Sequence, residues 1–421
     1  MSRAGGYAAG ARILSIGIAA TGVLSFAYFS VASYVLGDSE YKGISLLWSI
    51  LFVTVSVIYR PIEQLLSRTI ASRRARGLHT GHPLRTPLLL QAGFALAFLV
   101  AALALRVPLE QKVFDGATAL YWVLIVGVLA YAASYFARGW LAGHQWFGLY
   151  GGLVFMEAFS RLLFALAVAI GIASGQTAVA LGMAAAPFVS LVVVPLAFAR
   201  RPPREGAPPE RGEEELGLAR GGRFAVSVLA IMLAEQTLIN GGVLAAQLTS
   251  PGTPVAGYVF NALLVARAPL QLFQAVQGSL LPHLAGLHEA AAAGREQFSR
   301  AIHLTVKAIA AFAGAVALGL LVVGPFAMSV LFSDQATYGR LGLAAVGLGM
   351  GAHLAAGTFN QAALARERAP AAAAAWLACA VAFMGWMLLP VVGDELVRAE
   401  VGYLGAAALL CGLLTIVYRR S

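Results

Sequence analysis

Long apolar runs alternate with short polar segments along nearly the whole chain. About twelve of these runs are long enough for an α-helix to cross the roughly 30 Å of hydrocarbon in a bilayer, which takes about 20 residues. The pattern therefore predicts an all-α integral membrane protein. The expected spans are residues 12–35, 43–66, 87–106, 118–139, 148–172, 177–198, 223–247, 254–283, 302–324, 340–361, 371–390 and 401–418.

One segment interrupts this alternation near the middle of the chain. Residues 199–222 are rich in proline, glycine and charge and have no apolar face, which is typical of a linker. We expect a six-helix bundle over 1–198, a cytoplasmic linker over 199–222 and a second six-helix bundle over 223–421. Because six spans return the chain to its starting side, the bundles should be related by a pseudo-two-fold axis along the membrane normal.

Composition supports the membrane assignment and explains the charge. Hydrophobic residues make up 60% of the chain and charged residues 11%, whereas globular domains carry about 25% charged residues. The net charge is +10, and most of the 29 lysines and arginines, Arg138 at the end of the fourth span among them, fall on one side if both termini are cytoplasmic. Acids such as Asp394 and Glu400 are then expected in outer loops. The excess of basic residues indicates topology, and no nucleic-acid partner is predicted.

Two arginines stand inside apolar spans, each close to a proline that is expected to kink the helix. Arg60 is followed by Pro61 in the second span, and Arg267 precedes Pro269 in the eighth, so each lies in the second span of its half. An arginine in hydrocarbon is costly and by default suggests a functional site. For Arg60 the alternative is a side chain that extends to the inner headgroups. Glu63 follows three residues later, close enough to pair with Arg60.

The fifth span carries a second pair of charges. Glu157 and Arg161 are separated by one helical turn, a spacing that allows an ion pair within the helix. Such a pair should face protein or a water-filled cavity, because lipid does not solvate it. The alternative is a purely structural pair that holds two helices together.

Polar residues gather in the seventh and eighth spans. Glu235 is the best candidate for a protonatable coupling residue, although the polar groups around it could simply form hydrogen bonds between helices. In the eighth span the spacing of Arg267, Gln271 and Gln274 places them on one stripe. His353 in the tenth span is expected to be a hydrogen-bonding core residue. The polar residues predicted to line a path through the protein are Gln236, Asn240, Asn261, Gln271 and Gln274.

The sequence lacks the common motifs of several other functions. The chain has no GxxxxGK[ST] phosphate-binding motif, no HExxH and no close Cys/His cluster. Its two cysteines, Cys379 and Cys411, lie in apolar runs, as expected for free buried thiols. We therefore predict no catalytic residues, no metal and no cofactor. Short outer loops also disfavour a membrane glycosyltransferase or ligase.

Four segments resemble bacterial polysaccharide (O-antigen-type) flippases of the multidrug/oligosaccharidyl-lipid/polysaccharide exporter superfamily. RGWLAGHQWFGLYGGLVFMEAFSR is similar to their fourth-to-fifth span region, EQTLINGGVLAAQL and AGYVFNALLVARAPLQLFQAVQGSLLPHL to their seventh and eighth spans, and FNQAALARERA to the exit of their tenth. In many relatives an Asp follows the seventh-span Asn after one residue, and Gly242 occupies that position here. The coupling ion is therefore left open.

The resemblance implies a flippase that moves isoprenoid-diphosphate-linked oligosaccharide across the bacterial inner membrane by alternating access, with both termini cytoplasmic. Arg60, Arg161 and Arg267 would attract the diphosphate, and Glu63, Glu157 and Glu235 would balance charge or carry a coupling ion. Expected partners are membrane lipids and glycosyltransferases or a polymerase of the same pathway. The alternatives are a multidrug/cation antiporter of the same superfamily and a non-transporting scaffold in cell-wall assembly.

Overall fold

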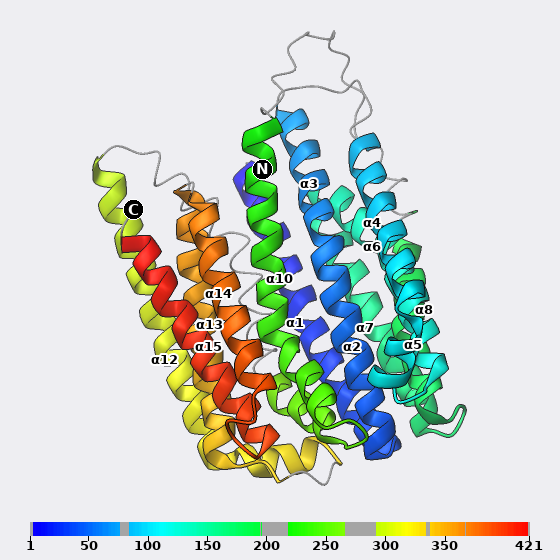
Figure 1. The fold of residues 1–421 in the computed structure, drawn as a ribbon. Helices are drawn as coiled ribbons and strands as arrows, with labels where there is room; N and C mark the ends of the chain where they lie inside the picture. The colour runs from blue at the N-terminus through cyan, green and yellow to red at the C-terminus, as the bar shows by residue number, and fades with distance from the viewer. Residues whose placement is uncertain are drawn as a thin grey trace. The chain divides into compact units, whose positions relative to one another are not determined.

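The computed structural model describes residues 3–75, 84–193, 195, 218–265, 292–333, 337–366 and 368–419. All regular structure in these ranges is helical (Figure 1). Ten helices are long and apolar enough to cross a membrane, and two shorter apolar helices cover Ala19–Val35 and Val255–Val265. The predicted all-α membrane class is therefore confirmed.

The chain divides into two compact units. The first comprises Met1–Leu36 and Leu47–Gly221, and the second comprises Gly37–Leu46 and Gly222–Ser421. The start of α2 thus clusters with the second unit. The helices before residue 194 are α1 (Arg3–Val35), α2 (Asp38–Ile58), α3 (Arg60–Ala75), α4 (Arg85–Ala104), α5 (Arg106–Pro108), the π-helical turn η1 (Leu109–Val113), α6 (Thr118–Gly143), α7 (Phe147–Ala169), α8 (Gly175–Ser190) and the 3-10 turn η2 (Leu191–Val193).

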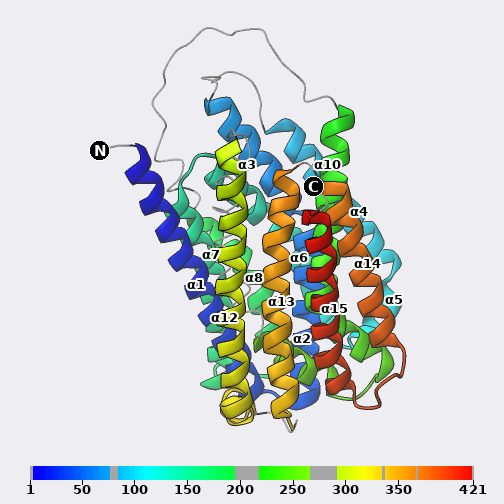
Figure 2. The same ribbon diagram turned by 90° about the vertical axis from the view of Figure 1, so that its left-hand side faces the viewer.

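The second unit contains the remaining long helices. They are α10 (Leu218–Thr249), α12 (Ala292–Leu331), α13 (Arg340–Ala365), α14 (Ala369–Leu388) and α15 (Glu395–Arg419). Helix α13 packs against both α12 and α15, and α14 packs against α15 (Figure 2). Of the predicted eighth span, only the helix Val255–Val265 is described. Arg267, Gln271 and Gln274 lie outside the described residues.

The proline after Arg60 interrupts the second span as its sequence predicts. Helix α2 ends at Ile58, Tyr59 forms a turn, and α3 begins at Arg60. Pro61 has no N–H to donate to the preceding turn, and the carbonyl of Tyr59 accepts the N–H groups of Ile62 and Glu63 instead. The chain continues in nearly helical form, so α2 and α3 together make one candidate span over Asp38–Ala71.

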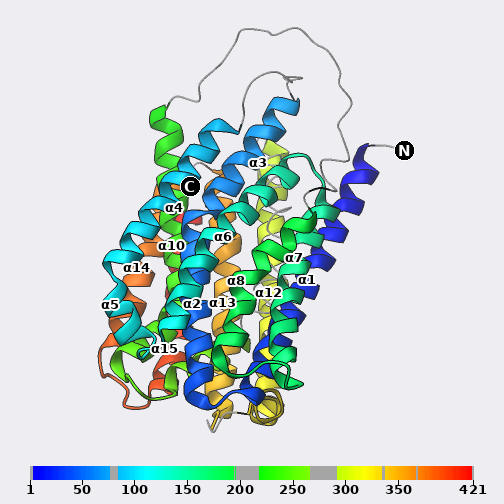
Figure 3. The ribbon, with the colours of Figure 1, turned by 90° about the vertical axis from the view of Figure 1, so that its right-hand side faces the viewer.

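Glycine residues allow pairs of helices in the first unit to pack closely. A Cβ at Gly139 of α6 would lie 2.8 Å from the carbonyl oxygen of Glu63, and one at Gly143 would lie 2.7 Å from the Cβ of Ile70. Helices α6 and α3 can therefore approach closely there. Helices α1 and α7 lie side by side (Figure 3), and a Cβ at Gly17 would lie 3.0 Å from the Cα of Gly151.

Large apolar side chains remain exposed on several long helices. Leu89 and Val100 of α4 are 64% and 59% exposed, and Phe326 of α12 is 72% exposed. Extended apolar surface of this kind is unusual for a soluble monomer and is typical of a membrane-facing helix. The cores of both units, by contrast, are filled by aromatic and aliphatic residues such as Tyr121, Tyr131 and Trp376.

Candidate functional site

A buried carboxylate, that of Glu157 in α7, organises the polar centre of the first unit. Glu157 is 2% exposed. Its Oε2 forms an ion pair with Nη2 of Arg138 on α6. Its Oε1 accepts a hydrogen bond from the hydroxyl of Ser134 and a longer one, 3.4 Å, from that of Ser190. Three helices, α6, α7 and α8, therefore meet at one carboxylate whose charge is balanced.

The predicted ion pair between Glu157 and Arg161 is wrong for the part of the chain that is described. Glu157 pairs with Arg138 of the neighbouring helix, and no ion pair joins it to Arg161. Arg138 was assigned to the cytoplasmic side from its position near the end of a span, yet it is 9% exposed. An arginine side chain is long enough to reach a partner on an adjacent helix, and local i, i+4 spacing does not reveal such a partner.

Arg161 occupies an aromatic pocket instead. It is 3% exposed, and its Nη1 donates a 2.8 Å hydrogen bond to the hydroxyl of Tyr131. The guanidinium carbon lies 5.1 Å from the ring centre of Trp48 and 5.6 Å from that of Phe52, a distance at which cation–π attraction is favourable. Its Nε is buried without a hydrogen-bond partner. Within the described residues, no carboxylate balances this charge.

Helix periodicity explains this arrangement. Tyr131, Ser134 and Arg138 are spaced i, i+3 and i+7, so they share one face of α6. Glu157 and Arg161 share one face of α7 for the same reason. Helix α7 follows α6 after the short connection His144–Gln145–Trp146, in which Gln145 has a positive φ of 60°. The two polar faces meet because such a short turn makes the helices antiparallel neighbours.

Glu63 lies near this cluster but on α3. It is half-buried, and its Oε1 accepts a 2.7 Å hydrogen bond from the hydroxyl of Tyr150. The guanidinium of Arg138 also stacks on the ring of Tyr135 at 4.4 Å. Arg60 is half-buried at the first position of α3, one turn before Glu63. Arg60 and Glu63 thus lie on α3, and Glu157 and Arg161 lie on α7. Both helices pack against α6.

The candidate residues of the second unit form neutral hydrogen bonds. Asn240 is 2% exposed and donates through Nδ2 to Oε1 of Gln236 at 3.1 Å, one turn earlier on α10. Asn261 is fully buried, and its amide oxygen accepts a hydrogen bond from the hydroxyl of Tyr41. Glu235 is half-buried. The bond from Tyr41 to Asn261 joins two helices, as the structural alternative expects, whereas the bond from Asn240 to Gln236 lies within α10.

Helices α13, α14 and α15 share a second set of buried polar groups. Trp376 donates through Nε1 to the amide oxygen of Asn360 at 3.1 Å. His353 is 3% exposed, and its Nδ1 lies 3.4 Å from the hydroxyl of Tyr403. The prediction that His353 is a hydrogen-bonding core residue is confirmed. Gly242, at the position where many flippases have Asp, packs against Leu263 and Phe383.

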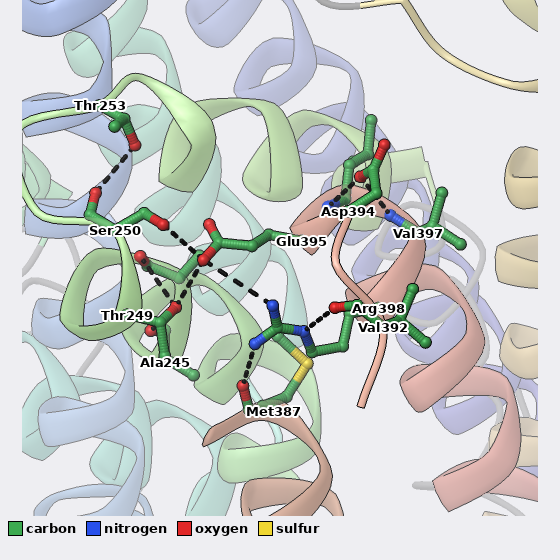
Figure 4. A network of polar contacts seen from close by, with 12 residues as sticks. Ala245, Thr249, Ser250, Thr253, Met387, Val392, Asp394, Glu395, Val397 and Arg398 are labelled. Atoms are coloured by element: carbon green, nitrogen blue, oxygen red, sulfur yellow. Dashed lines mark hydrogen bonds and ion pairs between the residues drawn. The ribbon is translucent and has the colours of Figure 1, made fainter. Parts of the chain in front are cut away.

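A further network joins the ends of α10, α14 and α15 (Figure 4). The Oε1 of Glu395 accepts hydrogen bonds from the hydroxyls of Thr249, at 2.9 Å, and Ser250. Arg398 lies 4.0 Å from the same carboxylate oxygen and donates to the carbonyls of Met387 and Val392. This network joins three helix ends through Oε1 of Glu395, whereas Oε2 of Glu395 is buried without a hydrogen-bond partner.

Comparison with known proteins gives a match in structure only. No family model and no curated protein sequence matches the chain. Among solved structures it is similar to an inward-facing multidrug resistance MATE family transporter of the MOP superfamily, with 13% identity, a TM-score of 0.66 and coverage of 97% of each chain. A MATE protein in the straight conformation gives 14% identity and a TM-score of 0.69, with coverage of 99% of this chain and 95% of the other.

Two further structures agree with these. A eukaryotic MATE transporter has 16% identity and a TM-score of 0.66, with coverage of 99% and 97%. A MATE transporter of Vibrio cholerae in the bent form has 15% identity and a TM-score of 0.58, with coverage of 99% and 97%. At such low identity the likeness concerns the fold. Over nearly its whole length, this chain has the fold seen in the MATE transporter structures.

Proposed function

We propose that this protein is a membrane transporter that moves isoprenoid-diphosphate-linked oligosaccharide across the bacterial inner membrane, and that Arg161 binds the diphosphate. The observation that supports this proposal most directly is the state of Arg161. Its guanidinium is buried with one hydroxyl and two aromatic rings around it and with no carboxylate partner among the described residues.

A buried cation without an anion is expensive. Removing one partner of a buried ion pair typically costs about 3–5 kcal/mol, because the remaining charge is left uncompensated. The rings of Trp48 and Phe52 recover part of this cost, since a desolvated cation–π contact contributes about 2 kcal/mol. The two rings cannot neutralise the positive charge of Arg161. A ligand with phosphate oxygens would neutralise it, because guanidinium binds phosphate through two parallel hydrogen bonds.

The contacts that Glu157 makes favour a diphosphate ligand over a drug cation. A site for cations needs an available carboxylate, but both oxygens of Glu157 are occupied by Arg138 and two serines. Glu63 accepts a hydrogen bond from Tyr150. The uncompensated charge in this cluster is thus positive. This argues against the multidrug/cation antiporter, although solved structures of the same fold include multidrug transporters.

The remaining expectations become parts of the same proposal. Arg60 and Arg267 would assist the diphosphate, and Glu63, Glu157 and Glu235 remain the candidates for charge balance or ion coupling. Residues Gln236, Asn240, Asn261, Gln271 and Gln274 would line the sugar path, and pathway glycosyltransferases or a polymerase would supply and consume the cargo. A non-transporting scaffold would not need an uncompensated arginine in its core.

The test is transport by the purified full chain in proteoliposomes, with a fluorescently labelled isoprenoid-diphosphate oligosaccharide as substrate. We expect Arg161→Met to weaken the apparent affinity about tenfold to a hundredfold, the range that corresponds to losing a hydrogen bond to a charged group worth about 1.5–3 kcal/mol. Arg161→Lys should retain part of the affinity, because it keeps the charge without the planar fork.

The matched control is Arg106→Met, which removes an exposed arginine from its ion pair with Glu110. It should transport like the wild type. Wild-type affinity in Arg161→Met at equal protein content would overturn the assignment of Arg161. Transport of a cationic dye by the wild type, increased in Arg161→Met, would instead establish the antiporter alternative.

A further inference from the structure

The contact between α13 and α15 in the second unit is lined by glycine. A Cβ at Gly349 of α13 would lie 2.8 Å from the Tyr403 ring and 3.1 Å from the Cα of Leu404 on α15. One heptad earlier, the space that a Cβ at Gly342 would need is filled by the carboxyl group of Glu400. We call this contact the α13–α15 seam, defined by Gly342, Gly349, Glu400 and Tyr403.

Glu400 was expected in an outer loop, and that expectation is wrong. It lies inside α15, between Ala399 and Val401, and is 1% exposed. Its Oε1 is buried without a hydrogen-bond partner, and no described residue donates a hydrogen bond to either oxygen. Glu157, the comparably buried carboxylate of the first unit, receives an arginine and two serines. Glu400 is therefore a buried acid whose charge nothing in the described structure balances.

The charged groups around Glu400 do not compensate it. On α15 itself, Arg398 is engaged with the carbonyls of Met387 and Val392 and faces Glu395. Asp394 is exposed, caps the start of α15 through the N–H groups of Leu396 and Val397, and repels a charge on Glu400.

The neighbouring helices add little. Helix α14 contains no charged residue, and Arg340 at the start of α13 is exposed. His353, three turns further along α13, contacts α15 through Tyr403. The one feature that favours a negative charge is the first turn of α13, whose amides point outward without a side-chain cap.

We propose that Glu400 is a proton-binding site, and that loss of its proton opens the α13–α15 seam. A neutral carboxyl group fits the closed seam, because it can be buried without a counter-ion. An ionised one would require water or a donor, and beside Gly342 the carboxyl group itself already fills the space between α13 and α15. Release of the proton therefore has a structural consequence, the separation of the two helices.

A proton suits this site better than a metal ion. A cation such as Na⁺ needs several oxygen ligands, and no group of three His, Cys, Asp or Glu residues that could hold a metal ion occurs in the described part of the chain. The backbone carbonyls along the seam belong to α13 and α15, where helical hydrogen bonds use them. The use of this proton to drive transport rests on the proposed function, whereas its binding does not.

The experiment is infrared difference spectroscopy of the full chain in lipid nanodiscs during a pH titration in choline chloride. The carbonyl stretch of a protonated carboxyl group is separate from that of a carboxylate. We expect the wild type to show one such band that disappears on alkalinisation, and Glu400→Gln to lack it. Asp394→Asn is the matched control, since it removes an exposed acid of the same helix and an asparagine can still cap α15. It should keep the band.

Gly342→Ala gives a second measurement that keeps Glu400 in place. The added methyl group needs the volume that the carboxyl group occupies, so the band should titrate at a different pH or be lost. A wild-type spectrum without any band that Glu400→Gln removes would refute the proton site. Loss of the band on replacing choline with Na⁺ at constant pH would refute it in favour of a sodium site.

Transport is measured separately, so the two proposals fail independently. If Glu400 couples transport, an imposed pH gradient should accelerate oligosaccharide uptake into proteoliposomes for the wild type and not for Glu400→Gln. A band that behaves as expected in a protein that moves no oligosaccharide would refute the proposed function and leave the proton site standing.

Discussion

The two units bury polar groups in different ways. In the first, α6 and α7 bring two arginines and a glutamate into the core, and one positive charge, that of Arg161, is left without an anion among the described residues. In the described part of the second, the buried contacts of α10, α13 and α14 are amide, indole, imidazole and hydroxyl hydrogen bonds. The second unit also carries charge, but on α15, where Arg398, Glu395 and Glu400 lie. The difference is that α6 and α7 meet through charged groups, whereas the buried contacts of α10, α13 and α14 are neutral.

This difference separates two tasks. Neutral hydrogen bonds between helices contribute modestly in membranes, and each holds a pair of helices in register. Buried charges cost more than they return unless they are fully paired, so their presence is weak support for stability and better support for a ligand. The first unit would then recognise the cargo. The second would respond through Glu400, its one uncompensated buried acid in the described residues.

Removing Glu157 should have the largest effect, and it tests directly whether the two units differ in their buried contacts. Glu157→Ala leaves Arg138, like Arg161, buried without an anion, and we expect a loss of about 3–5 kcal/mol in the free energy of unfolding. Thermal unfolding in detergent, followed by tryptophan fluorescence, measures the effect. Arg138→Met combined with Glu157→Leu should restore much of the stability, because replacing both partners with apolar groups removes the uncompensated charge.

Asn240→Ala is the matched change in the second unit. It removes a neutral hydrogen bond to Gln236 and should cost about 1 kcal/mol. Equal losses from Glu157→Ala and Asn240→Ala would mean that the two units do not differ in the way described.

Glycine substitutions sharpen the comparison at the level of packing. Gly139→Ala in α6 places a methyl group 2.8 Å from the backbone oxygen of Glu63, which cannot move without shifting α3, and should destabilise by about 1–3 kcal/mol. Gly241→Ala in α10 meets Sδ of Met384 at the same distance. That flexible side chain can rotate away, so the cost should stay below about 1 kcal/mol.

The control for both changes is Gly152→Ala in α7. Nothing lies within 4 Å of the added methyl group, so the higher helix propensity of alanine should raise stability by about 0.5–1 kcal/mol. Chemical denaturation of the three variants in the same detergent gives their order. A Gly139→Ala variant as stable as the control would show that the contact between α3 and α6 is looser than the structure indicates.

The sequence predicted the fold better than the site. Span length and the proline at position 61 are local signals, and they led to an all-α membrane protein with a break beside Arg60. Glu157 and Arg161 were also recognised as buried. Their partners were not, because Tyr131 and Arg138 come from a neighbouring helix and their pairing depends on how α6 and α7 pack.

Position near the end of a span was the most misleading signal. Arg138 and Glu400 were both assigned to the aqueous phase, and both are buried. The i, i+3, i+7 spacing of Tyr131, Ser134 and Arg138 could have indicated a polar face on α6. For Glu400 the available signal was the glycine pattern of α13, since Gly342 and Gly349 lie one heptad apart and make room for a bulky neighbour.

The smallest expected effect concerns a carboxylate of the first unit that lies outside the spans. Glu110 in η1 accepts hydrogen bonds from the hydroxyl of Thr118 and, at 3.1 Å, from Nε of Arg106. The Thr118 hydroxyl, followed by Arg106, holds the pKa of Glu110 below its ordinary value. A lowered pKa in the folded state means that the unfolded chain binds the proton more readily. The contribution to stability is therefore present above the ordinary pKa and disappears as the pH falls through the folded-state value.

Thr118→Val should thus be less stable than the wild type at neutral pH, and the difference should shrink as the medium is acidified. Thr69→Val is the control, because the Thr69 hydroxyl donates to the carbonyl of Leu65, which does not titrate. Its difference from the wild type should not change with pH. Parallel melting curves for Thr118→Val and the wild type from neutral to acidic pH would contradict the role of Thr118. A difference that shrinks on acidification would show that Glu110, a paired carboxylate in a connecting segment, contributes a small and pH-dependent amount to the free energy of unfolding. Glu157 in the core is expected to contribute more.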